Sequence, residues 1–247
     1  MTADAVRIAM WSGPRNISTA MMRAFENRPD TAVIDEPFYA AYLAATGLNH
    51  PMRDEVIASQ PTDWRVVADA LVGAIPDGRR VYYQKHMTHH MLPGVGRTWA
   101  RACRNAFLIR RPEDVLASYA NVRDEASLEA IGLPQQRELF AEASDWLGRA
   151  PPVIDTHDVL SKPRGLLSAL CAALDIPFTE RMLSWPAGRR ASDGVWAPAW
   201  YASVERSTGF AAAHAPIAFD DLRDDLKPIA EKARPIYDEL ARHKLKT

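Results

Sequence analysis

Short apolar runs alternate with longer segments of helical periodicity along this chain. Runs rich in β-branched and aromatic residues predict strands at Val6–Trp11, Thr31–Ile34, Arg80–Gln84, Asn105–Ile109 and Pro152–Asp155. Helical patterns occupy the segments Ser18–Glu26, Trp64–Ala74, Pro112–Arg123, Gln135–Leu147 and Lys162–Leu174. This alternation predicts one α/β domain over residues 1–247, with a central parallel sheet of about five strands flanked by helices. Ligands of such sheets bind beyond the carboxyl ends of the strands.

Two later segments are less regular. Residues 184–210 are rich in Pro, Gly, Ser and Trp without a clear period. They predict a long ordered loop, and such loops often act as lids. The tail Asp220–His243 predicts a final amphipathic helix that Pro228 and Pro235 interrupt.

Composition narrows the classes of partner. The chain has 247 residues, 47% hydrophobic and 25% charged, with a net charge of −1, which argues against charge-driven binding to nucleic acid. Its only cysteines, Cys103 and Cys171, encode neither a disulfide framework nor a metal cluster. No secretory signal or membrane-spanning run is visible. We therefore expect a cytoplasmic protein with no membrane partner.

The first predicted strand leads into a loop suited to an oxyanion. Pro14 turns the chain, and Ser18 and Thr19 open the next helix. Amide groups at a helix start bind phosphate or sulfate, and the guanidinium of Arg15 can grip two oxygens. The nucleoside-triphosphate form of this loop has a lysine where Ile17 stands, which disfavours ATP or GTP. On these residues alone, Ser18 could equally be a plain helix cap.

The string P-R-N-I-S-T resembles the P-R-S-G-T-T or P-K-S-G-T-T of sulfotransferases, which also follows the first strand. Asn16 and Ile17 replace the family's Ser and Gly. The arginine makes the loop most similar to that of the tyrosylprotein-type enzymes. The resemblance implies a P-loop-type domain that binds 3′-phosphoadenosine 5′-phosphosulfate (PAPS) through Pro14, Arg15, Asn16, Ile17, Ser18 and Thr19.

A second motif follows the fourth predicted strand. Arg110 and Arg111 end that strand, Pro112 starts a helix, and Ser118 lies two turns into it. The pattern resembles the sulfotransferase motif R-[ND]-P-x-x-x-x-x-S, with Arg111 in place of Asn or Asp. In that family the Arg and the Ser bind the 3′-phosphate of PAPS. On its residues alone, the segment could equally be the start of a solvent-exposed helix with two surface arginines.

Two further segments agree with the family. A stretch that ends at Leu174–Pro177 resembles a structural part of sulfotransferases, to which we assign no chemistry. The string Glu205–Thr208 resembles an R-S-T in the loop that closes over PAPS in tyrosylprotein-type enzymes. That resemblance implies further cofactor contacts from Arg206, Ser207 and Thr208.

Sulfuryl transfer needs a group to stabilise the leaving phosphate and a base to deprotonate the acceptor. Arg15 is the candidate for the leaving group. Glu36 is the first candidate base, because we expect the second strand to lie beside the first and to open near Arg15. Tyrosylprotein-type enzymes have a catalytic Glu at a similar distance from the loop, after a P-D pair that Pro29–Asp30 matches. The alternative is that Asp35 and Glu36 are merely polar residues at a strand end.

The segment KHMTHH after the third strand holds the second candidate base. Cytosolic sulfotransferases have K-T-H at this strand end, with the His as base. Lys85 matches and is expected to contact sulfate or acceptor, while Met87 takes the His position and leaves His86 as the candidate. Together with His89 and His90, His86 also suggests a metal site. Because no second clear ligand group accompanies them, we expect no metal.

Aromatic residues flank the same strand ends and form either acceptor-pocket walls or core: Phe38, Tyr39, Tyr42, Trp196, Trp200 and Tyr201. Together these features predict a sulfotransferase that transfers a sulfuryl group from PAPS to a hydroxyl or amine of a small acceptor and releases adenosine 3′,5′-bisphosphate. One alternative is a P-loop small-molecule kinase, with Asp35 as its acidic strand end but without the loop lysine. The other is a non-catalytic nucleotide-binding protein of the same fold.

Overall fold

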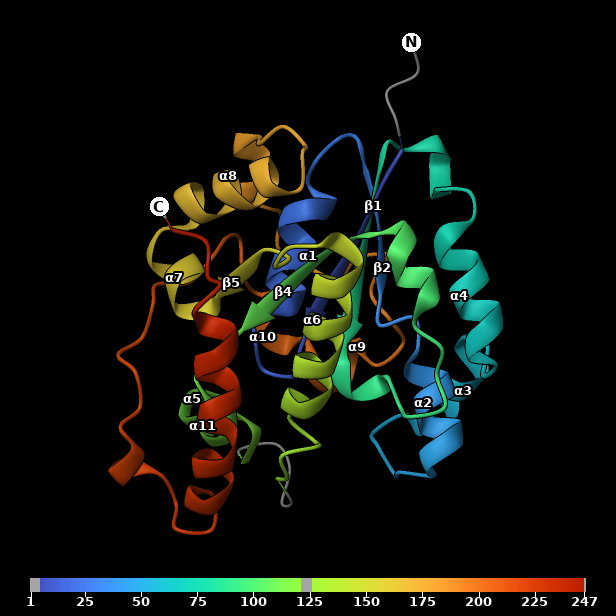
Figure 1. Ribbon diagram of the computed structural model, residues 1–247. Helices are drawn as coiled ribbons and strands as arrows, with labels where there is room; N and C mark the ends of the chain where they lie inside the picture. The colour runs from blue at the N-terminus through green and yellow to red at the C-terminus, as the bar shows by residue number, and fades with distance from the viewer. Residues whose placement is uncertain (1–4, 121–125, 247) are drawn as a thin grey trace.

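A central parallel sheet organises the computed structural model, which describes residues 5–120 and 126–246 (Figure 1). Its five strands follow the order β2-β3-β1-β4-β5. Their bounds are β1 Val6–Ser12, β2 Thr31–Asp35, β3 Val81–Met87, β4 Arg104–Ile109 and β5 Val153–Asp155. The predicted α/β class and the parallel sheet are confirmed.

The prediction that the second strand lies beside the first is wrong. β2 pairs with β3, with Asp35 opposite Lys85, and β3 in turn pairs with β1. Burial explains the order. All seven residues of β3 are buried and require a central position, whereas β2 is short and half-buried, as edge strands commonly are. Lys85 therefore stands between the loop after β1 and Glu36.

Helices cover both faces of the sheet, because the side chains of β1 alternate between two cores. Val6, Ile8 and Met10 pack with one face, and Ala9 and Trp11 with the other. The first core includes residues of α1 Ser18–Glu26 and α8 Pro163–Ala173. The second includes residues of α4 Trp64–Val72, α6 Leu133–Leu147 and α11 Lys227–Ala241.

The remaining helices are short and lie mostly near the strand ends. Before the late segment they are α2 Tyr39–Thr46, α3 Arg53–Ser59, α5 Pro112–Ala120 and α7 Thr156–Ser161. The predicted end of α5 at Arg123 falls outside the described residues. A third core packs α2 and α3 against Trp196 and Tyr201 of the late segment.

The late segment is more ordered than expected. Residues 184–210 contain α9 Ala197–Trp200 and α10 Ala202–Glu205, and a bridge joins Ser184 to Gly209. In the tail, Pro228 lies in the first turn of α11 and Pro235 sits inside a continuous helix, so the predicted interruption is wrong. No helix in the described part of the chain is long and apolar enough to cross a membrane.

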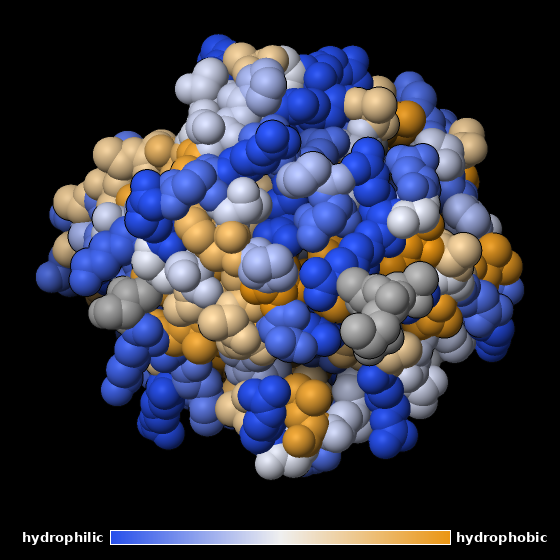
Figure 2. Space-filling model, turned by 90° about the horizontal axis from the view of Figure 1, so that it is seen from above, coloured by the Kyte–Doolittle hydropathy of each residue, from blue (hydrophilic) through white to orange (hydrophobic). Residues whose placement is uncertain are grey.

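Figure 2 shows the molecule from above, the side on which β1 begins. Hydrophilic side chains predominate on this face, and apolar side chains form separate small groups. Apolar side chains that are scattered in this way are ordinary for a protein surface. The residues with predicted chemistry lie at the opposite edge, where the strands end.

Candidate functional site

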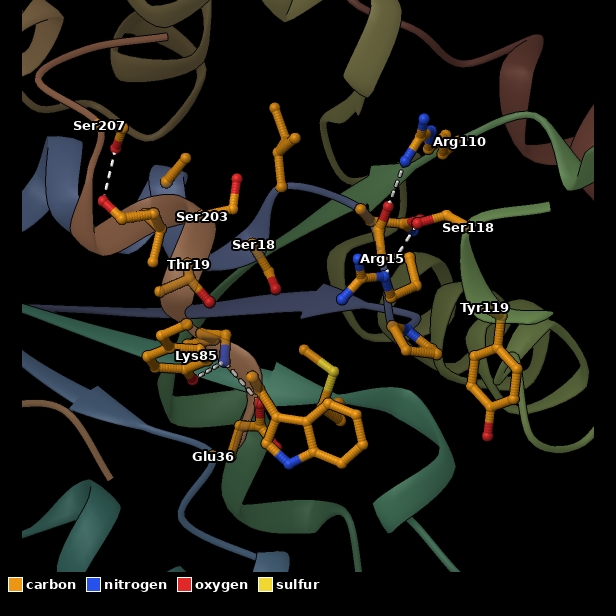
Figure 3. Close-up of a pocket in the computed structure, with 18 of the residues that line it drawn as sticks. Arg15, Ser18, Thr19, Glu36, Lys85, Arg110, Ser118, Tyr119, Ser203 and Ser207 are labelled. Atoms are coloured by element: carbon orange, nitrogen blue, oxygen red, sulfur yellow. Dashed lines mark hydrogen bonds and ion pairs between the residues drawn. The ribbon is translucent and has the colours of Figure 1, made fainter. Parts of the chain in front are cut away.

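A cavity of about 490 Å³ lies at the carboxyl ends of the strands. The loop after β1, Glu36 after β2, Lys85 on β3 and Arg110 after β4 all line it. Ser118 on α5 and several residues of the late segment complete the wall (Figure 3). The cavity has the size and placement of a small-molecule site in a parallel α/β sheet.

The loop after β1 keeps a left-handed backbone without glycine. Ile17, the residue before α1, has φ 53° and ψ 17°, and Arg15 has φ 61°. Such conformations cost about 1–3 kcal/mol each for non-glycine residues. Two hydrogen bonds hold them: Arg110 Nη1 donates to the Arg15 carbonyl at 2.6 Å, and Asn16 Nδ2 donates to the Leu108 carbonyl at 3.3 Å.

The start of α1 faces the same cavity. Ser18 and Thr19 line it, and within the described part of the chain no side chain caps the helix. The amide groups of the first helical turn lack partners inside the helix, and they carry the positive end of its dipole. The loop can therefore bind an anion through backbone amides and two hydroxyls.

Arg15, Arg110 and Ser118 converge on one side of the cavity (Figure 3). Arg15 Nε donates to Ser118 Oγ at 3.0 Å, and Arg110 donates to the backbone of Arg15. Among residues 5–120 and 126–246, neither guanidinium forms an ion pair with a carboxylate. Burial lowers the pKa of both arginines. The charges of Asp114 and Asp155 act on Arg110 from beyond ion-pair distance. Two partly buried cations that form no ion pair in the described part of the chain favour an anionic ligand.

Lys85 is at the centre of a buried ionic network. Its Nζ donates to Asp35 Oδ1 at 2.7 Å, to Glu36 Oε1 at 2.6 Å and to the hydroxyl of Tyr201 at 2.8 Å. Burial alone would lower the pKa of Lys85, but the charges of Asp35 and Glu36 outweigh it and raise the pKa well above its usual value. All three ammonium hydrogens bond to protein, so Lys85 holds side chains in place although it lines the cavity.

Glu36 projects its carboxylate toward the cavity (Figure 3). Its φ of 40° is left-handed. The backbone is fixed on both sides, because its amide donates to the Lys85 carbonyl at 3.0 Å and Gln60 Nε2 donates to its carbonyl at 3.2 Å. Burial raises the pKa of Glu36, against the opposing charge of Lys85. Strained residues of this kind cluster at functional sites.

His86 lies away from the cavity. It is absent from the described cavity lining, and its ring stacks on Trp11 with centroids 4.5 Å apart. Burial lowers its pKa to about 3. The side chain points to the sheet face that packs with Trp11 and Trp99, because successive residues of a strand alternate between faces. As placed, His86 cannot contact a ligand in the cavity.

Two other histidines of the same segment reach the cavity. His89 and His90 belong to a short turn, Thr88–His90, that follows β3. His90 Nε2 lies 4.0 Å from Glu36 Oε2. Sequence reasoning singled out His86 because it is adjacent to Lys85, and the turn that redirects the chain had no clear sequence signal. Within the described residues, no group of three or more His, Cys, Asp or Glu side chains could hold a metal ion.

The late segment contributes fewer of its predicted contacts. Ser207 lines the cavity, whereas Arg206 and Thr208 are exposed outside the described lining. Ser207 is fixed by Trp185 Nε1, which donates to its Oγ at 3.0 Å. Ser203 also lines the cavity and was missed, because the short helix α10 that presents it has no sequence period.

Of the flanking aromatic residues, half reach the cavity. Tyr39, Trp200 and Tyr201 line it, while Phe38 and Trp196 are buried in the core. Tyr42 instead lines a second cavity of about 1230 Å³. The two cavities share four lining residues, His50, His89, Tyr119 and Ala130. The second cavity therefore adjoins the first beside these four residues.

Comparisons with known proteins identify the family. A model of the sulfotransferase domain matches residues 6–243. Branched-chain-amino-acid aminotransferase-like protein 1 of Arabidopsis thaliana is 37% identical over 243 residues, which cover 98% of this chain and 42% of that protein. This chain therefore spans less than half the length of that relative.

Solved structures share the fold at low sequence identity. The sulfotransferase from Alicyclobacillus acidocaldarius has a TM-score of 0.55 and 13% identity, over 97% of both chains. The sulfotransferase domain from the curacin biosynthetic pathway has a TM-score of 0.52 and 16% identity, over 94% of this chain and 98% of that one. These likenesses agree with the family model, which matches nearly the whole chain, and the chain belongs to the sulfotransferase-domain family.

Proposed function

We propose that this protein transfers a sulfuryl group from PAPS to a small acceptor and releases adenosine 3′,5′-bisphosphate. The observation that carries the proposal is the pair Arg15 and Arg110. Both line the cavity, neither forms an ion pair with a carboxylate in the described part of the chain, and Glu36 lines the same cavity. A donor that carries a phosphosulfate on O5′ and a phosphate on O3′ of its ribose suits two cations that lie at the ends of different strands.

Each end of the donor has its own set of groups in this proposal. The amides at the start of α1, with Ser18 and Thr19, bind the phosphosulfate as a helix N-terminus binds anions. Arg110 and Ser118 bind the 3′-phosphate. The hydrogen bond from Arg15 to Ser118 links the two subsites, so binding at one subsite helps to order the side chains of the other.

The transfer itself divides among three side chains. PAPS supplies the sulfuryl group, whose bond to the 5′-phosphate breaks as the acceptor oxygen bonds to sulfur. Arg15 stabilises the negative charge that develops on the leaving phosphate. Glu36 accepts the acceptor's proton, and Lys85 fixes the carboxylate through the 2.6 Å hydrogen bond. In this proposal the loop Arg and the Glu act as the corresponding residues of tyrosylprotein-type enzymes do.

The acceptor approaches through the second cavity in this account. That cavity meets the first beside His50 and His89. The cavities also share Tyr119, which directly follows Ser118, so we propose that the acceptor enters on the histidine side. Donor and acceptor then lie on opposite sides of the sulfur, as in-line displacement requires.

A small-molecule kinase fits the site less well. Phosphoryl transfer by P-loop enzymes needs a loop lysine and an acidic group for Mg²⁺. Ile17 occupies the lysine position. Asp35 Oδ1 accepts from Lys85, and its Oδ2 accepts from the Tyr201 hydroxyl and the Gly194 amide. Both carboxylate oxygens of Asp35 are therefore engaged.

Isothermal calorimetry separates these functions. We expect adenosine 3′,5′-bisphosphate to bind in the presence of EDTA, and ATP with Mg²⁺ to bind far more weakly. When Arg15→Ala and Arg110→Ala are measured in the same way, Arg137→Ala is the matched control, because Arg137 is exposed on α6 away from the cavity lining. Tight binding of ATP with Mg²⁺ and none of the bisphosphate would favour the kinase.

A further inference from the structure

The ring of His90 is held rigidly beside Glu36. Its side chain is 2% exposed. It stacks on Tyr39, with centroids 4.9 Å apart and planes at 9°, and on Tyr42, at 4.7 Å and 29°. Stacking on two rings fixes the plane of the imidazole, and with it the directions in which the two ring nitrogens point.

Neither ring nitrogen of His90 has a hydrogen-bond partner among the described residues. The side chain nevertheless lines the cavity. Buried polar groups are almost always paired, so an unpartnered imidazole on a cavity wall indicates a ligand group. The 4.0 Å between His90 Nε2 and Glu36 Oε2 is too long for a direct hydrogen bond. It suits an oxygen that makes a hydrogen bond of about 2.8 Å to each atom.

The surroundings determine the charge of this ring. Burial lowers the pKa of His90 well below its usual value, and the charges of His89, His50, Lys85 and His86 act in the same direction. The imidazole is therefore neutral and carries one N–H. The facing carboxylate of Glu36 favours that proton on Nε2. The site thus presents one acceptor, Glu36, and one donor, His90.

We infer that His90 and Glu36 together bind the reacting oxygen of the acceptor, and that the acceptor is an alcohol or a phenol and not an amine. The inference rests on the proposed sulfuryl transfer. A hydroxyl oxygen donates its hydrogen to Glu36, accepts the N–H of His90 with one lone pair and attacks sulfur with the other. As the new O–S bond forms, the bond from sulfur to the 5′-phosphate breaks, the phosphate keeps that electron pair, and the hydroxyl proton passes to Glu36.

An amine cannot satisfy both groups. A neutral amine nitrogen has a single lone pair. If that pair accepts the N–H of His90, it cannot attack sulfur, and if it attacks sulfur, the buried N–H of His90 is left unpaired. The pairing of an acceptor with a donor around one atom therefore selects an oxygen nucleophile.

Two conservative variants of His90 separate a binding role from a packing role. In His90→Gln the side-chain amide reaches about as far as Nε2, whereas in His90→Asn it ends near Nδ1; both are uncharged. Radiolabelled transfer from PAPS is measured with the matched pairs 2-phenylethanol and 2-phenylethylamine, and phenol and aniline, with release to water recorded throughout. His243→Asn is the control, because His243 is exposed beyond α11 and outside the cavity lining.

We expect the hydroxyl compound of a pair, and water, to receive label while the amine does not. His90→Asn should lower kcat/KM by about 10- to 100-fold, the effect of one lost hydrogen bond to a reacting group. His90→Gln should retain most activity, and both variants should bind adenosine 3′,5′-bisphosphate like the unmodified protein. Amines that react as fast as alcohols, or full activity of His90→Asn, would overturn the inference.

Two further outcomes are distinguishable. If bisphosphate affinity falls as much as the rate in His90→Asn, the residue only supports packing and the inference is wrong. If the unmodified protein neither binds the bisphosphate nor transfers label, the proposed function fails and the inference fails with it. A crystal structure with the bisphosphate tests the same point without variants. An ordered oxygen bonded to both Nε2 and Oε2 is expected, and a direct bond from His90 to another protein group would contradict it.

Discussion

The buried pair Asp35 and Lys85 makes a quantitative prediction about stability. The side chains of both residues are at most 1% exposed, and their charged atoms are 2.7 Å apart. Asp35 also accepts hydrogen bonds from the Tyr201 hydroxyl at 2.7 Å and from the Gly194 amide at 3.1 Å. The carboxylate thus ties the late segment to the ends of β2 and β3, and Asp35→Asn should loosen both attachments.

The expected cost follows from these contacts. Removing one partner of a buried ion pair destabilises a protein by about 3–5 kcal/mol. In Asp35→Asn the side chain keeps its shape, but its NH₂ group replaces one of the two oxygens that accept hydrogen bonds from Lys85, Tyr201 and Gly194. Glu36 still neutralises part of the lysine charge. We therefore expect the lower end, about 3 kcal/mol. For a domain of this size each kcal/mol lowers Tm by about 2–4 °C, which gives a fall of roughly 6–12 °C.

Urea unfolding followed by circular dichroism measures this cost. Asp54→Asn is the matched control, because Asp54 pairs with Arg53 at 2.8 Å but its side chain is 89% exposed; about 0.5 kcal/mol or less is expected there. A double-mutant cycle with Lys85→Met isolates the pair. If Asp35→Asn costs no more than Asp54→Asn, or if the cycle shows no coupling, the network does not hold the site together.

The remaining predictions concern single side chains. Arg15→Ala should lower kcat by about 10²- to 10³-fold with a smaller effect on bisphosphate affinity, and unchanged turnover in steady-state kinetics would remove Arg15 from the transfer. Arg110→Ala should weaken adenosine 3′,5′-bisphosphate by roughly 1.5–3 kcal/mol in calorimetry and 5′-AMP by less, because 5′-AMP loses only the support that Arg110 gives to the loop at the Arg15 carbonyl; equal losses would contradict a 3′-phosphate contact. Glu36→Gln should abolish most turnover at near-normal bisphosphate affinity, and an active variant would place the base elsewhere. Burial lowers the pKa of His86 from 6.5 to about 3 in the folded protein, so only the unfolded state takes up this proton as the pH falls. Because of this residue, the free energy of unfolding should fall by about 1.4 kcal/mol per pH unit between roughly pH 6 and 4. Urea unfolding of His86→Gln should show a shallower fall with pH, and equal pH slopes for the two proteins would refute this.

The sheet could be predicted from the sequence because each strand is a short apolar run. The run predicted at Val6–Trp11 forms β1, one residue longer, and the helix predicted at Ser18–Glu26 has those bounds. The order of the strands could not be predicted in the same way. Periodicity shows that a strand is buried, but the insertion of β3 between β1 and β2 depends on how much of each strand is covered.

The cavity residues divide along a similar line. Arg15, Arg110 and Ser118 meet because strand ends converge at one edge of the sheet, which the sequence already implied. The histidines could not be assigned, because the turn after β3 decides which of them face the cavity, and it presents His89 and His90 and not His86. The role of Asp35 in holding Tyr201 depends on a contact across 166 positions of sequence, which no local pattern encodes.

Loss of labelled sulfur from PAPS in the absence of metal is the most direct test of sulfuryl transfer by this protein. The protein is incubated in EDTA with PAPS that carries ³⁵S in its sulfuryl group, beside Arg15→Ala and a protein-free blank, and the labelled products are separated. We expect the label to leave the nucleotide, to a hydroxyl compound or to water, without metal or ATP. Arg15→Ala should release at least tenfold less label, since an effect of about 10²- to 10³-fold on the rate is expected. Label that stays on the nucleotide as in the blank would contradict it.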